Sequence, residues 1–158
     1  TMNNLTFGDN ERQYYETIAG GSGAGYGFNG TDGIQTHMTN SRLTDPEVLE
    51  QRYPVQIELF SIREGSGGRG KWAGGNGLLR KIRFLAPMTV SIISGSRRIP
   101  PFGLKGGGSG TIGINQLELI NGNLKRLEGC SSIQVTAGQA ILIATPGGGG
   151  YGRKTNHQ

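Results

Sequence analysis

Cysteine is almost absent from this chain, which has a single cysteine, Cys130, among 158 residues. One cysteine excludes an intrachain disulfide and a zinc site built from several cysteines. No run of about 18 apolar residues occurs, as a membrane-spanning helix would need, and residues 1–13 lack the basic flank and apolar core of a signal peptide. We therefore expect a reduced, cytoplasmic setting and no membrane partner.

Proline and aromatic residues are also scarce, whereas glycine is abundant at 30 residues. The glycines follow no Gly-X-Y period, which excludes a collagen-like chain. Glycine clusters form tight corners, anion-binding nests or mobile lids, and in β proteins most of them are turns, so we expect turns here. No GxxxxGK[ST] sequence is present, and the GxGxxG match at 25–30 is not followed by an amphipathic helix. No nucleotide-binding loop is therefore predicted.

Basic residues exceed acidic ones by 16 to 11, which gives a net charge of +5. The basic residues are scattered without a long run, and the aromatic residues are too few for a base-stacking platform. No nucleic-acid partner is therefore expected. Arg97 and Arg98, at the end of a predicted strand, are placed either to reach an acidic substrate or to form a solvated rim or subunit interface.

Short segments rich in branched residues and bounded by Gly, Pro or Asn predict a mainly β fold, as sandwich or barrel-like layers with long glycine-rich loops. The predicted strands are residues 55–62, 78–84, 88–94, 117–120, 133–135 and 140–144. We divide the chain into a polar, glycine-rich loop region with a short helix (1–54), a β-rich domain (55–152) and a disordered tail (153–158).

One short helix is predicted at residues 46–52. Thr44 and Glu47 have the spacing of a capping box, and Pro46 suits the first turn. Pro54 disfavours helix at the residue before it. Two turns are not stable alone, so we expect Val48 and Leu49 to dock this helix on the rest of the chain.

Several motifs together resemble the hydantoinase B and 5-oxoprolinase family. They are ETIAGGSGAG, DG, THMTN with an arginine two residues later, TDPEVLE and RYP, followed by FSIREGSGGRGKWAGGNGLLRKIRF, PPFGLKGG and TPGGGGYG. The resemblance runs from about Met2 to Gly152. The family commonly shows HTHMTNTR, where this chain has Gln35 in place of the first histidine and Ser41 in place of the last threonine.

The resemblance implies an ATP-dependent cyclic amide hydrolase that opens 5-oxoproline, in glutathione metabolism, or a hydantoin. It also implies a hetero-oligomer, in which a hydantoinase A-type component uses ATP with Mg. Family B components are several hundred residues long, so the resemblance makes this chain a C-terminal fragment that is inactive alone. Any divalent metal would then lie in the N-terminal part. The alternative is a non-catalytic, β-rich docking module of such a complex, or of a related ATP-dependent ketone carboxylase.

Opening a lactam near neutral pH needs an activated carbonyl oxygen, a nucleophilic water and a proton for the leaving nitrogen. His37 is the natural proton carrier, unless it is a structural histidine bonded to the loop backbone. Asp32 or Glu16 would orient its imidazole, although an Asp-Gly pair more often caps a turn. Asn40 would contact a carbonyl or phosphate oxygen, or else cap a turn. The candidate catalytic residues are therefore His37, Asn40 and Asp32.

Three further residues are candidates for substrate binding. Thr39 would contact a carbonyl or phosphate oxygen, and its alternative is a bond to the local backbone. Arg42 would clamp a carboxylate or phosphate, and its alternative is an ion pair with Asp45 or Glu47. Ser22 lies between glycines without the strand and helix of a nucleophile elbow, so we assign it to binding rather than to nucleophilic attack. We assign no metal ligand and no nucleotide-binding residue within this chain.

Overall fold

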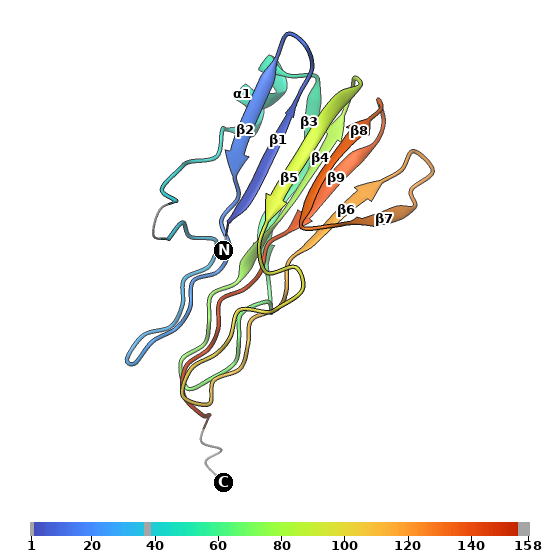
Figure 1. Ribbon diagram of the computed structural model, residues 1–158. Coiled ribbons are helices and arrows are strands. Elements are labelled where there is room, and N and C mark those ends of the chain that lie inside the picture. The colour runs from blue at the N-terminus through green and yellow to red at the C-terminus, as the bar shows by residue number, and fades with distance from the viewer. Residues whose placement is uncertain (1, 37–38, 155–158) are drawn as a thin grey trace.

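Two antiparallel sheets and one helix make up the computed structural model, which describes residues 2–36 and 39–154 (Figure 1). The first sheet has the strand order β2-β1-β5-β8 and the second β3-β4-β9-β6-β7. In chain order the elements are β1 (Asn3–Gly8), β2 (Gln13–Thr17), α1 (Pro46–Arg52), β3 (Val55–Arg63), β4 (Gly77–Phe84), β5 (Met88–Ser94), β6 (Ile114–Glu118), β7 (Leu124–Leu127), β8 (Cys130–Val135) and β9 (Ala140–Ala144). No helix among the described residues has the length and apolar character needed to cross a bilayer.

A core shared by both sheets confirms the prediction of a mainly β sandwich. Alternate residues of the strands are buried, as on β5, because successive side chains of a strand point to opposite faces. Burying one such aliphatic side chain stabilises the fold by about 1.5–3 kcal/mol. The first sheet contributes, among others, Leu5, Phe7, Val90 and Ile92. The second sheet contributes, among others, Ile82, Phe84, Ile141 and Ile143.

The six predicted strands are all present, with shifts of a few residues at β6 and β8. Strands β1, β2 and β7 were not predicted, because each is short and polar or glycine-containing. Strand β1 pairs with both β2 and β5, so it belongs to the first sheet although it lies in the region that we treated as a loop.

Helix α1 has the predicted bounds, but two details of the prediction are wrong. Its N-cap is Asp45, whose carboxylate accepts the Glu47 N–H at 3.0 Å, and not Thr44. Since Pro46 occupies the first helical position, the capping position falls at the residue directly before it. Of the two docking residues, Leu49 is fully buried, whereas Val48 remains 37% exposed.

The glycine-rich runs are mostly extended segments packed side by side, and our expectation of turns holds only at a few points, such as 26–27, 64–65 and 105–106. We call residues 20–31, 65–77, 101–111 and 145–152 the glycine bundle, which lies below the sheets in Figure 1. Residues 145–150 are entirely buried in it. The Gly148 N–H donates to the Gly75 carbonyl at 2.9 Å, and the Gly148 carbonyl accepts from Gly68 at 2.8 Å.

Backbone atoms in the bundle lie closer together than any side chain would allow. A Cβ atom on Gly148 would stand 1.9 Å from the Ser22 carbonyl oxygen, and one on Gly149 would stand 1.9 Å from that of Phe102. Glycine is therefore needed here for close approach rather than for its freedom of φ.

A charged network on the outer face of the second sheet gives a testable pH dependence. Glu58 and Glu118 each pair with both Lys81 and Arg83. Hydrogen bonds from Arg83 and then Lys81 lower the pKa of Glu58 to about 2 from an ordinary 4.5, although desolvation acts in the opposite direction. A carboxyl with a lowered pKa stabilises the fold above its unfolded pKa, and this contribution is lost as the pH falls through the folded pKa.

We expect Glu58→Gln to remove about 1 kcal/mol of stability at pH 6, because solvent screens this partly exposed network. The difference from the unsubstituted chain should shrink between pH 4.5 and pH 2. Urea unfolding at several pH values measures it. Glu64→Gln is the matched control, since Glu64 is exposed and makes no ion pair among the described residues. Equal losses in both variants at pH 6 would contradict this account of the network.

Candidate functional site

The polar loop, residues 31–42, is fastened to the bundle and to the first sheet at its beginning. The Gln35 side chain donates to the Thr17 carbonyl at 2.8 Å, and the Ile34 N–H donates to the Gly20 carbonyl at 3.1 Å. Asp32 accepts the Asn76 N–H at 2.6 Å. These bonds fix residues 32–35 beside the end of β2.

The next part of the polar loop contains most of the candidate residues. His37 lies outside the described residues. Thr39 donates both its N–H and its hydroxyl to the Thr36 carbonyl, at 3.2 and 2.8 Å. Asn40 and Arg42 are exposed, and within the described part of the chain Arg42 makes no ion pair with the acids at the start of α1. Their polar groups are therefore accessible to a small molecule or to a partner chain.

Ser22 and Asp32 both bond to backbone. The Ser22 hydroxyl accepts the Thr31 N–H at 2.7 Å and joins the two ends of the bundle segment 20–31. The Asp32 carboxylate holds the backbone of Asn76, whose side chain in turn accepts the Gly67 N–H at 3.0 Å. Both side chains thus connect the polar loop to the bundle.

Glu16 forms a buried ion pair that the sequence analysis did not predict. Arg80 donates to its two carboxylate oxygens at 2.7 and 2.9 Å, and both side chains are 1% exposed or less. The Tyr14 hydroxyl donates to the same carboxylate at 2.9 Å, and burial raises the pKa of Tyr14. The available signal was an arginine on the otherwise apolar face of a strand, between Leu78 and Ile82.

A cleft of about 820 Å³ lies between the glycine bundle and the start of the polar loop. Ser22 and Thr36 give it polar groups, and the exposed rings of Phe28 and Phe102 give it apolar walls. Its size and mixed lining suit a small organic ligand. The sequence analysis named Ser22 but did not predict that the segment around Phe102 would form the opposite wall.

Comparison with known proteins identifies the family. The profile described as "Hydantoinase B/oxoprolinase" matches residues 1–154. This chain belongs to the hydantoinase B/oxoprolinase family. The resemblance seen in the sequence motifs is thereby confirmed.

A 5-oxoprolinase of Dictyostelium discoideum is 52% identical over 153 residues, which cover 97% of this chain and 12% of that protein. The chain therefore spans about one eighth of the length of this relative. Among solved structures, the ATP-dependent caprolactamase from Pseudomonas jessenii aligns with a TM-score of 0.75 at 23% identity, covering 96% of this chain and 28% of that one. A nucleotide-free structure of acetone carboxylase aligns with a TM-score of 0.74 at 17% identity, and the alignment covers 96% of this chain and 26% of that one. These two structures share the fold.

In this hydantoinase B/oxoprolinase chain many N–H groups of the glycine runs are already engaged in backbone hydrogen bonds. A phosphate-binding loop needs backbone N–H groups that point at the ligand. Within the bundle, many N–H groups donate instead to carbonyl oxygens, either of a neighbouring segment or of the same segment. The donors include Gly68, Gly74, Gly75, Gly107, Gly108, Gly110, Gly147, Gly148 and Gly150.

Proposed function

We propose that the chain is the C-terminal part of an ATP-dependent cyclic amide hydrolase of the 5-oxoprolinase or hydantoinase type. The observation that carries this proposal is the 52% identity to a 5-oxoprolinase over 97% of the chain. The shared fold with an ATP-dependent caprolactamase supports it, because a caprolactam is also a cyclic amide. In this proposal the polar loop contributes to an active site that other parts of the enzyme complete.

Within this proposal the loop residues have separate tasks. His37 carries the proton to the leaving nitrogen, and Asn40 and Thr39 contact a carbonyl or phosphate oxygen. Arg42 binds a carboxylate or phosphate. Asp32 acts as a positioning residue, because its carboxylate holds the loop on Asn76.

ATP and Mg are assigned to a hydantoinase A-type component and not to this chain. The engaged N–H groups of the glycine bundle support that assignment, since an N–H that donates to a backbone carbonyl is not free for a phosphate. Any divalent metal is assigned to the N-terminal part of the B component. The partners are thus the A-type component, the rest of the B component and a small cyclic amide, in a cytoplasmic hetero-oligomer.

One observation favours the alternative of a docking module. On strand β3, Phe60 pairs with Arg80 and Ile62 pairs with Leu78, and both of these β4 partners are buried. Paired residues of antiparallel strands point to the same face of the sheet, so Phe60 and Ile62 lie on the core face. Phe60 and Ile62 nevertheless remain 46% and 48% exposed. An uncovered core face at an edge strand suits packing against another part of the enzyme, here or in a related ketone carboxylase.

Arg42→Gln in the full-length B component, assembled with its A-type partner, tests the proposed function. Losing a charge-assisted bond should raise the KM for 5-oxoproline, which bears a carboxylate, by about 10- to 100-fold. The KM for an unsubstituted hydantoin, which lacks that carboxylate, should remain unchanged. Steady-state ring opening measures both constants.

Arg52→Gln is the matched control, because it removes one exposed arginine from the last turn of α1. An unchanged KM for 5-oxoproline in the Arg42 variant would remove Arg42 from the substrate site. Loss of assembly with normal activity in the complexes that do form would favour the docking module instead.

A further inference from the structure

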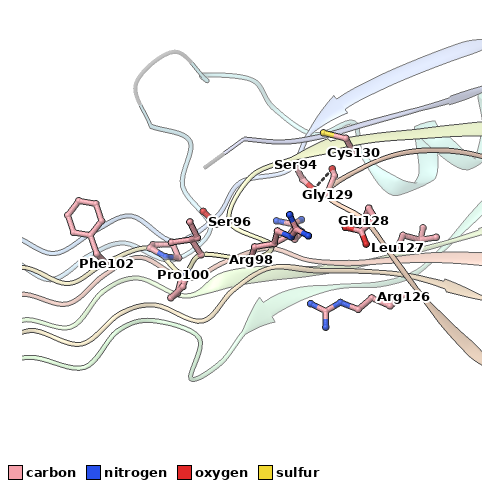
Figure 2. Close-up of a pocket in the computed structure, with 13 residues that line it drawn as sticks. Ser94, Ser96, Arg98, Pro100, Phe102, Arg126, Leu127, Glu128, Gly129 and Cys130 are labelled. Atoms are coloured by element: carbon pink, nitrogen blue, oxygen red, sulfur yellow. Dashed lines mark hydrogen bonds between the residues drawn. The ribbon is translucent and has the colours of Figure 1, made fainter.

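A second cleft, of about 1060 Å³, lies between residues 94–102 and 126–130 (Figure 2). Its charged lining residues are Arg97, Arg98, Arg126 and Glu128, so the positive charges exceed the negative by two. Figure 2 shows Phe102 at one end of the lining and Cys130 towards the other. None of the described residues of the polar loop lines this cleft, although Phe102 also belongs to the wall of the first one.

At the base of this cleft, Arg97 is a buried cation with neutral partners. Its guanidinium donates to the side-chain oxygens of Asn115 and Asn3 at 2.8–3.0 Å and to the Gly95 carbonyl at 2.7 Å. No carboxylate lies within ion-pair distance of it among the described residues. Desolvation, and then repulsion from Arg63, lowers the pKa of Arg97 to about 10, so it is still charged at neutral pH.

Gly113 makes room for this arrangement. A Cβ atom there would stand 2.1 Å from the Arg97 guanidinium. The structure thus holds an uncompensated positive charge in place, although burying a charge without a counter-ion is costly.

The two arginines at the mouth of the cleft are also without counter-ions. Arg98 and Arg126 are exposed, and neither side chain makes an ion pair or hydrogen bond within the described part of the chain. Glu128 lines the same cleft but lies beyond ion-pair distance of both. Ile99 and Phe102, exposed at 79% and 75%, add apolar surface beside the charges.

We propose that this cleft binds a small oxyanion, a carboxylate or phosphate, that carries an apolar group. The anion would lie between Arg98 and Arg126, where a guanidinium can donate two parallel hydrogen bonds to its oxygens. It would also supply the negative charge that Arg97 lacks. The apolar part would contact Ile99 and Phe102. This site is separate from the proposed catalytic loop and does not depend on ring opening.

Cys130 provides a reporter for the test, because it is the only thiol in the 158-residue chain and lines the cleft. Iodoacetate and iodoacetamide alkylate the same thiolate, but only iodoacetate carries a negative charge. The ratio of their rates therefore reports the local potential and cancels changes in the thiol itself. Arg98→Gln and Arg126→Gln should each lower the iodoacetate-to-iodoacetamide ratio by about 3-fold.

Lys125→Gln is the matched control, since Lys125 is exposed on the same strand as Arg126 but does not line the cleft. Its ratio should stay within about 1.3-fold of the unsubstituted chain, because screening weakens charges away from the cleft. Equal ratios in all four proteins, or an equal fall in the Lys125 variant, would overturn the proposal.

Ligand protection completes the test. At constant ionic strength, inorganic phosphate or benzoate should slow the reaction of Cys130 with iodoacetamide, whereas neutral benzamide should not. Protection should disappear in Arg98→Gln. Protection by phosphate alone identifies a phosphoryl ligand, and protection by benzoate alone identifies a carboxylate. Protection by neither anion, or equal protection by benzamide, would contradict an oxyanion site.

Discussion

Replacing Gly148 with alanine is expected to unfold most of the chain at room temperature. The new Cβ would stand 1.9 Å from the Ser22 carbonyl oxygen and 2.2 Å from its carbon. Overpacking a core with side chains usually costs about 1–3 kcal/mol. Here the neighbour is backbone that is itself hydrogen-bonded to Thr31 and Gly75, so it cannot turn aside. We expect a loss of more than about 4 kcal/mol, which approaches the whole stability of a domain at the low end of the usual range of about 5–15 kcal/mol.

Gly95→Ala is the matched control for that substitution. A Cβ at Gly95 meets nothing within 4 Å, and its φ lies outside the left-handed region. We expect a change of less than about 1 kcal/mol, of either sign. Urea unfolding followed by circular dichroism compares the two variants. If Gly148→Ala were as stable as Gly95→Ala, the close-packed glycine bundle would be wrong.

The strands rich in branched apolar residues could be predicted from sequence, and those without them could not. Residues 88–94 (MTVSIIS) and 140–144 (AILIA) are rich in branched side chains, and their predicted bounds are those observed. Strand β2 reads QYYET and is a strand because β1 pairs with it residue by residue. This hairpin is held in the first sheet by the pairing of β1 with β5, far along the chain, which a local pattern does not contain.

The glycine bundle shows a second limit of sequence reasoning. A glycine cluster signals that the backbone is free of side chains, but it does not say which other backbone comes close. Ser22, Gly75 and Gly148 meet in the structure although more than 50 residues separate each from the next. Without that knowledge, local turns were the natural prediction.

The candidate site was partly accessible from sequence. The sequence analysis assigned residues 1–54 to a polar, glycine-rich loop region, and within that region Gln35 and Asp32 fasten the beginning of the polar loop. Part of the wall of each cleft comes from residues 94–104, far along the chain from the polar loop. The uncompensated charge of Arg97 depends on neutral partners at Asn3 and Asn115, and no spacing rule connects those three positions.

His37→Ala should have the largest effect on catalysis. A positioned general acid or base contributes about 10²- to 10⁴-fold to a proton-transfer step. Ring opening needs such a proton at the leaving nitrogen, whereas ATP use is assigned to the A-type component. The variant should therefore lose ring opening by about that factor while still assembling with its partner. Ser41→Ala, at an exposed position of the same loop with no assigned role, is the matched control and should keep its activity.

The most direct test of the account is ring-opening turnover of the assembled enzyme, measured side by side for the unsubstituted protein, His37→Ala and Ser41→Ala. Both 5-oxoproline and a hydantoin should be used, with assembly checked by size-exclusion chromatography. The account predicts an assembled His37→Ala complex with turnover reduced by at least about 100-fold, and a Ser41→Ala complex within about 2-fold of normal. Normal turnover by an assembled His37→Ala complex would contradict a catalytic polar loop and leave this chain as a docking module.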